Sequence, residues 1–96
     1  MQPSPADWPS EIARLVGARI AALRHQRGWS QRALADRVGR TATQIGLWER
    51  GEYLPKLPAL LELTEAYGLG SIEELLGDML GSRRLIELRS DSPGGR

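Results

Sequence analysis

The residues best suited to chemistry lie in one short stretch, residues 40–51, which reads RTATQIGLWERG. An arginine opens it, four short uncharged side chains follow, and a second arginine stands near its end. These groups carry out no covalent chemistry alone, but guanidinium groups pair with phosphate, and hydroxyl and amide groups exchange hydrogen bonds. The stretch therefore predicts a binding surface and favours phosphate as its ligand.

Groups that enzymes use for catalysis are sparse in this chain. It has no cysteine and a single histidine, His25, which excludes a disulfide framework, thiolate chemistry and a multi-histidine metal site. No glycine-rich phosphate loop, carboxylate pair or nucleophile with a neighbouring base stands out. We therefore expect a protein that is not an enzyme and that has no cofactor, metal ion or small-molecule ligand.

The charges of the chain are unevenly distributed. Residues 1–50 carry eight arginines and four acidic side chains, whereas residues 51–80 carry one lysine and six acidic side chains. The last sixteen residues are again net positive. One end of the domain is therefore a candidate for phosphate contact and the other is not. The alternative is a salt-bridged surface with scattered arginines.

Length and composition predict one small soluble domain. The 96 residues are 41% apolar and 26% charged, with ends rich in Pro, Ser and Gly. We expect a flexible tail at 1–10, a folded domain at 11–80, and an arm with a flexible tail at 81–96. No apolar run of membrane-spanning length and no signal peptide is evident, so the expected location is the cytoplasm.

Apolar periodicity and turn residues predict an all-α fold of five helices. The expected helices cover about 12–27, 31–38, 42–50, 58–67 and 72–80. Ser30, Thr41 and Ser71 are the expected amino-terminal caps of the second, third and fifth helices. Gln44 and Glu74 should complete capping boxes with Thr41 and Ser71. In the fourth helix the expected buried residues are Leu60, Leu61, Leu63 and Tyr67.

Residues 29–51, WSQRALADRVGRTATQIGLWERG, carry the pattern of two helices that cross closely around a tight turn. Such a crossing needs a small residue on the first helix, a glycine at the turn and apolar anchors on the second helix. These are Ala35, Gly39, Ile45 and Trp48. From about Val16 to Leu76 the chain resembles the Cro/repressor-like, or XRE, helix-turn-helix family. The resemblance implies a lambda-repressor-like five-helix bundle that binds operator DNA as a two-fold dimer.

In this family the helix at 42–50 corresponds to the recognition helix, whose first turn enters the major groove. Arg40 adds charge beside the helix amino terminus, where free N–H groups attract phosphate. Gln44 is a candidate to pair with adenine. The other candidates are Thr41 in the same turn and three residues whose methyl groups suit thymine, Ala42, Thr43 and Leu47. Many relatives carry longer polar side chains here, so DNA shape or other segments should assist base reading.

The resemblance also assigns roles outside the recognition helix. Residues expected to contact phosphate are Gln31, Arg50, Tyr53 and Lys56. For Gln31 the alternative is a plain helix-surface role, and for Tyr53 it is packing. Arg24 and Glu49 resemble a partly buried salt bridge between the first and third helices, which would be structural. Trp48 is expected in the core.

The predicted helix at 72–80 carries more apolar side chains than one face of a short helix can point inward. Part of this surface is therefore expected to contact a second copy of the chain, helped by residues 83–89. The predicted contact residues are Ile72, Leu76, Met79 and Leu80.

Together these features predict a homodimeric, sequence-specific transcriptional regulator, and most simply a repressor, that binds double-stranded DNA at inverted repeats. The alternative is an adaptor that keeps the fold but binds a partner protein of transcription instead of DNA. The thinly polar recognition face supports the adaptor. Salt-dependent binding to duplex DNA distinguishes the two.

Overall fold

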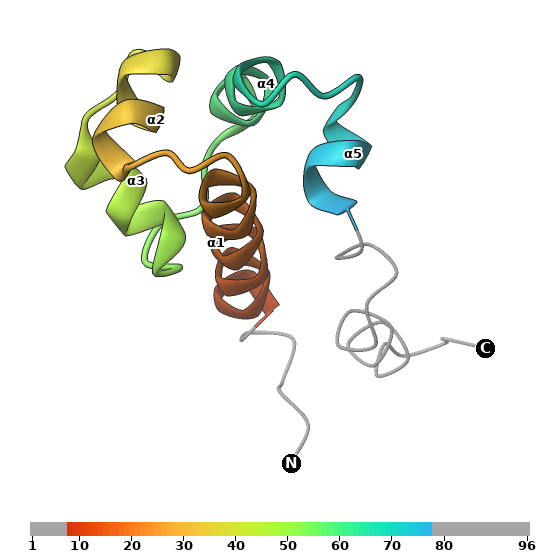
Figure 1. Cartoon of the computed structure of the whole chain (residues 1–96). Coiled ribbons are helices and arrows are strands. Elements are labelled where there is room, and N and C mark those ends of the chain that lie inside the picture. Colours follow the sequence, from red (N-terminus) through yellow and green to blue (C-terminus); the bar gives the residue numbers. More distant parts are fainter. Residues whose placement is uncertain (1–7, 78–96) are drawn as a thin grey trace.

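The computed structural model describes residues 8–77, and its regular elements within that range are all helices (Figure 1). They are α1 (Trp8–Gln26), α2 (Gln31–Val38), α3 (Ala42–Glu49), α4 (Leu57–Ala66) and α5 (Ile72–Leu76). The predicted all-α class and the order of the five helices are confirmed. Among the described helices, none has the length and apolar character needed to cross a membrane.

Two helix ends differ from the predictions by more than one residue. α1 begins at Trp8 instead of residue 12, so residues 8–10 belong to a helix and not to the predicted tail. Pro9 explains the early start, because proline suits a first helical turn, whose N–H groups have no helical partner. α5 ends at Leu76 instead of residue 80, because Gly77 follows with a φ of 56°, outside the helical region. Residues 78–80 lie outside the described range.

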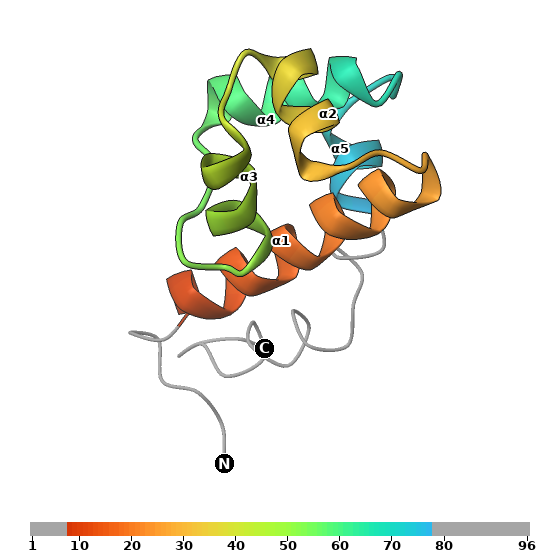
Figure 2. The ribbon, with the colours of Figure 1, turned by 60° about the vertical axis from the view of Figure 1, so that its left-hand side comes forward.

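α1 is the longest of the described helices and contacts α3 and α5. α2 and α3 lie on one side of it and α5 on the other, while α4 lies across the far end (Figure 1). Figure 2 shows α3 over the amino-terminal part of α1 and α5 nearer its carboxy-terminal part. Each helix contributes one of the fully buried large side chains, which are Ile20, Leu34, Ile45, Leu63 and Leu75. The helices therefore share one core, and α3 is fixed directly against α1.

The contact between α1 and α3 is a close approach of backbones. A Cβ atom added at Gly17 of α1 would collide with the carbonyl oxygen of Trp48 in α3. Trp48 itself is buried in the core, as predicted. Gly51, just after α3, has a φ of 76° and lies against Arg14. The absence of a side chain at Gly17 and Gly51 therefore allows the backbones of α1 and α3 to approach each other closely.

α4 buries a different set of residues from the predicted one. Leu63 and Tyr67 are buried and Leu60 is partly buried, but Leu61 is 54% exposed. The prediction for Leu61 is wrong because residues two positions away from Ala59 and Leu63 lie on the opposite side of the helix.

Tyr67 joins three segments of the domain. Its hydroxyl donates a 2.8 Å hydrogen bond to the Ile20 carbonyl, and its ring stacks on Trp29 at 5.8 Å between centroids. Two arginines extend the stack, with Arg27 over the Tyr67 ring and Arg37 over the Trp29 ring. Burial raises the pKa of Tyr67 well above its ordinary value, because it disfavours the phenolate. Trp29 thus packs between Tyr67 and Arg37.

Candidate nucleic-acid interface

The first turn of α3 is fixed by a reciprocal cap. The Gln44 backbone N–H donates to Thr41 Oγ1 at 3.1 Å, and the Thr41 N–H donates to Gln44 Oε1 at 3.1 Å. The predicted capping box is therefore confirmed. The N–H groups of Ala42 and Thr43 precede the helix's own hydrogen-bond ladder, so they are available to an external acceptor. Thr43 is exposed beside them.

This cap restricts what Gln44 can read. Pairing with adenine uses both ends of the amide, the oxygen as acceptor and the nitrogen as donor. In the structure the oxygen already accepts from the Thr41 N–H, so the cap fixes the amide and leaves one oxygen lone pair for adenine. Thr43 is therefore the better placed polar side chain of the first turn.

α3 lies between two hollows of different chemistry. The smaller, 330 Å³, has a largely polar lining formed by Gln31, Ala42, Thr43, Gly46 and Arg50. The larger, 620 Å³, has mostly apolar walls, and its lining includes Arg40, Gln44, Leu47, Trp48, Tyr53, Leu54 and Lys56. The structure thus gathers every predicted DNA-contact residue except Thr41 along the two flanks of one helix. Tyr53 is 63% exposed, which favours its contact role over packing within the chain.

Gly46 makes the smaller hollow possible, and sequence reasoning missed it. A Cβ atom added there would lie 3.1 Å from Arg50 Nη1 and 3.7 Å from Gln31 Oε1. The absent side chain therefore lets the Arg50 guanidinium cross α3 towards Gln31. The available signal was the glycine itself, since glycine inside a helix costs about 1 kcal/mol relative to alanine.

A buried ion pair contacts Gln31, which lines this hollow. Arg24 Nε lies 2.7 Å from Glu49 Oε2, and Arg24 Nη2 donates to Oε1 at 3.0 Å. Hydrogen bonding to Glu49 raises the pKa of Arg24 above its ordinary value. Gln31 Nε2 donates to the same Glu49 oxygen at 3.0 Å. The predicted bridge between α1 and α3 is confirmed, and it also positions the side chain of Gln31.

Comparison with known proteins agrees with this geometry. A family model described as a helix-turn-helix domain matches residues 15–76. The chain belongs to the helix-turn-helix domain family. It is similar to the "Uncharacterized HTH-type transcriptional regulator y4dJ" of Sinorhizobium fredii (strain NBRC 101917 / NGR234), with 32% identity over 63 residues. That match covers 66% of this chain and 82% of the relative.

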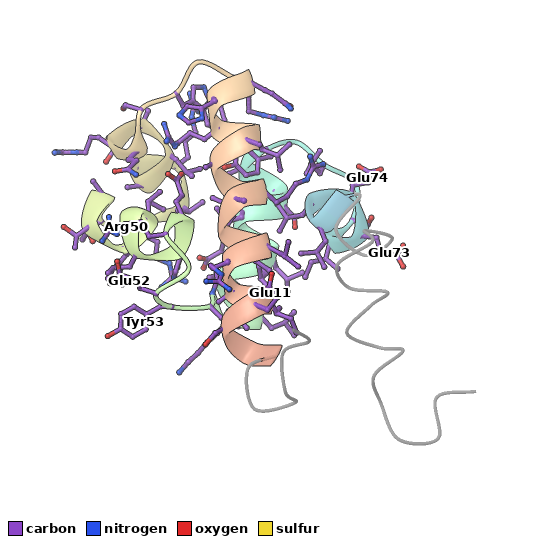
Figure 3. All side chains as sticks on the ribbon, turned by 90° about the horizontal axis from the view of Figure 1, so that it is seen from below. Glu11, Arg50, Glu52, Tyr53, Glu73 and Glu74 are labelled. Atoms are coloured by element: carbon purple, nitrogen blue, oxygen red, sulfur yellow. The ribbon has the colours of Figure 1, made fainter. Side chains whose placement is uncertain are left out.

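Two of the predicted phosphate-binding cations of this helix-turn-helix domain already have carboxylate partners. Arg50 Nε lies 2.6 Å from Glu52 Oε2, and both side chains are more than half exposed. An exposed pair of this kind contributes little, so phosphate can replace Glu52. Figure 3 shows Arg50, Glu52 and Tyr53 on the same side of the molecule.

Arg40 is held more firmly. It pairs with Glu62 of α4 at 2.7 Å and lies over the Trp48 ring at 5.9 Å. Its buried Nε has no hydrogen-bond acceptor among the described residues. Arg40 therefore faces α4 and links it to α3, instead of standing free beside the helix amino terminus.

Two acidic residues of α5 lie away from the α3 surface. Glu73 and Glu74 of α5 are on the opposite side of α1 from Arg50 and Tyr53 (Figure 3). Glu74 Oε1 accepts from the Gly70 N–H at 2.8 Å, so the second predicted capping box is only half formed, by Ser71 Oγ. The charge split along the sequence is therefore only partly a split between two faces, because Glu52 and Glu62 pair with Arg50 and Arg40 beside α3.

The described part of α5 uses its apolar side chains within the domain. Leu75 is buried, and Ile72 and Leu76 pack partly buried against the core. Met79 and Leu80, with residues 83–89, lie outside the described range. The predicted contact with a second chain at these residues stays a prediction, and the surplus of apolar side chains that motivated it is smaller than expected.

Proposed function

We propose that this protein is a sequence-specific transcriptional repressor of the Cro/repressor-like type, which binds an inverted-repeat operator as a homodimer in the cytoplasm. The observation that carries the proposal is the two-sided character of α3. Its inner face buries Ile45 and Trp48, whereas its first turn is exposed beside a polar hollow that contains Thr43 and Arg50. The relative from Sinorhizobium fredii, whose name describes a transcriptional regulator, supports the same role.

Binding follows from the groups that surround α3. The free N–H groups of Ala42 and Thr43 and the positive end of the helix dipole receive phosphate or a base acceptor. Gln31 and Arg50 hold the backbone of one strand from the smaller hollow, and the predicted contacts of Tyr53 and Lys56 lie on the other flank. Thr43 offers a hydroxyl and a methyl group to base edges in the major groove. An occupied operator excludes other proteins from the same DNA, which is the simplest route to repression.

The homodimer is part of this proposal because two copies related by a two-fold axis read two inverted half-sites. The sequence places the contact between copies on α5 and the residues after it, at Ile72, Leu76, Met79 and Leu80.

The decisive experiment selects genomic DNA fragments bound by the purified protein. We expect an inverted-repeat consensus. Thr43→Ala should relax the preference at one or two base pairs of each half-site, with a loss of about 1–3 kcal/mol. Asp36→Ala, which changes an exposed residue of α2 away from both hollows, is the control and should keep the consensus.

A second candidate function is an adaptor that binds a partner protein. The larger hollow favours it, because its walls are mostly apolar and the exposed Tyr53 and Leu54 stand at its edge. Absence of salt-dependent binding to any duplex, together with an unselective fragment pool, would replace the repressor with the adaptor.

A further inference from the structure

Two exposed leucines of α4 belong neither to the core nor to the lining of the two hollows beside α3. Leu57 is 60% exposed and Leu61 is 54% exposed, and both lie on α4. Residues four apart in a helix lie on the same side, so the two leucines form one continuous strip. The neighbouring Pro58 is exposed as well. Apolar surface gathered in this way on a small domain marks a contact with another molecule.

The two ends of this strip carry opposite charges. Lys56 lies at the amino-terminal end, and Glu65 lies one turn beyond Leu61 at the other end. Both are exposed, and neither has an ion-pair partner among the described residues. About nine helical rises, or roughly 13 Å, separate the two residues along α4, so they cannot pair within one chain.

Lys56 is also an unusual residue for its position. It is the N-cap of α4, but it makes no side-chain hydrogen bond to the first turn. A side-chain oxygen is the group that normally satisfies these N–H groups, and a negative charge is favourable there because of the helix dipole. The amino end of α4 would therefore be stabilised by a carboxylate, but α4 has no acidic residue in its first turn.

We infer that α4 packs antiparallel against α4 of a second copy of this chain, with Leu57 and Leu61 at the centre. A two-fold axis across the strip brings Lys56 of each copy to Glu65 of the other, so that one surface is complementary to itself. The carboxylate missing at the amino end of α4 then comes from the partner. This inference rests on the homodimer of the proposed function, and it places the interface on α4 in place of the contact predicted on α5.

The arrangement is compatible with DNA binding through α3. Thr43 and Arg50 line the smaller hollow, whereas Lys56 and Pro58 belong to the lining of the larger one, on the α4 side. Covering the α4 strip therefore leaves the reading residues free. It also reassigns Lys56 from phosphate contact to the dimer and leaves the phosphates to Gln31, Arg50 and Tyr53.

The size of the strip sets the expected strength of the dimer. α4 has 10 residues and is about 15 Å long. A contact along so short a helix buries less than the roughly 800 Å² per partner of a standard interface. We therefore expect a reversible dimer with a dissociation constant on the order of 10 μM, which DNA with two half-sites would stabilise.

Sedimentation equilibrium of the full chain without DNA tests the inference. The wild type should dimerise reversibly, and Leu61→Glu should weaken the dimer at least about tenfold by placing a charge in the apolar centre. Ala22→Glu adds the same charge at an exposed position of α1 and should leave the dimer unchanged. Thermal melts by circular dichroism establish that each variant is folded.

Charge exchange gives a second test that leaves both leucines in place. Lys56→Glu and Glu65→Lys should each weaken the dimer, and the variant with both changes should recover the wild-type constant to within about threefold. Recovery requires the two residues to meet between chains, since they are too far apart within one. A wild type that stays monomeric, a Leu61→Glu variant that dimerises normally, or a double variant that fails to recover overturns the inference.

DNA binding is measured separately by fluorescence anisotropy on the same samples. A chain that binds DNA but does not dimerise through α4 overturns this interface and leaves DNA recognition standing. A chain that dimerises through α4 but binds no duplex overturns the proposed function and leaves the interface standing.

Discussion

Glu49 is the residue on which the structure and the candidate site most directly depend. Its carboxylate neutralises Arg24 and accepts from Gln31, and the Arg24 and Glu49 side chains are only 10% and 7% exposed. Removing one member of a buried pair leaves the other charge without a partner, which is more destabilising than losing an exposed pair. One carboxylate thus couples the stability of the domain to the position of a DNA-contact residue.

We predict that Glu49→Ala lowers the free energy of unfolding by about 3–5 kcal/mol. Urea titration followed by circular dichroism measures it. The matched control is Asp36→Ala, which breaks the exposed 3.6 Å pair with Arg32 and should change stability by less than about 1 kcal/mol. Equal losses in the two variants would contradict a structural role for the Arg24–Glu49 bridge.

At the scale of elements, the sequence predicted features that depend on neighbouring residues better than features that depend on packing between helices. Ser30 and Thr41 cap α2 and α3 as their sequence positions indicate, because capping needs only residues a few positions apart. Gly17 and Gly46 stand out as glycines inside helices, but the sequence does not tell which atoms each of them accommodates. Leu61 was misplaced because it belongs to a run of apolar residues, and the run alone does not fix which of them lie on the side of Ala59 and Leu63. The pairing of Arg40 with Glu62 likewise depends on how α3 and α4 pack.

The crossing of α1 and α3 predicts the effect of one added methyl group. Gly17→Ala places a Cβ against the backbone of Trp48 and Glu49, which no rotamer change can relieve. We expect a loss of at least about 3 kcal/mol, at the upper end of overpacking effects, measured by thermal unfolding. Gly46→Ala is the comparison, because its added Cβ meets the movable Arg50 side chain, and it should be clearly less destabilising. A stable Gly17→Ala protein would mean that α3 does not lie against α1 as described.

Tyr67 predicts how stability changes in alkaline solution. Its pKa is raised in the folded state, chiefly by burial, so the folded chain keeps a proton that the unfolded chain releases above about pH 10. The stabilisation is therefore fully present below pH 10 and falls by about 1.4 kcal/mol per pH unit above it. The measurement is the difference in unfolding free energy between wild type and Tyr67→Phe, which cancels other titrating groups. A difference that stays constant across pH 10 would contradict the raised pKa.

On the scale of the whole molecule, the positions of the charges matter more than their sum. The net charge is only +1, yet Arg50 lies at the α3 surface while Glu73 and Glu74 lie on the opposite side of α1. Charges farther from a bound duplex than about 8–10 Å are largely screened at physiological salt. The α3 face can therefore attract phosphate although the chain as a whole is nearly neutral.

This separation predicts the salt dependence of DNA binding. The logarithm of affinity falls linearly with the logarithm of salt concentration, with a slope of about −0.9 for each phosphate neutralised. Arg50→Ala should therefore weaken binding to all duplexes and make the slope shallower by about 0.9 per half-site, as measured by fluorescence anisotropy from low to physiological salt. Arg37→Ala removes the same charge from the stack on Trp29, away from both hollows, and should leave the slope unchanged. If the two variants change the slope equally, net charge governs binding, and α3 loses its assignment as the DNA-binding face.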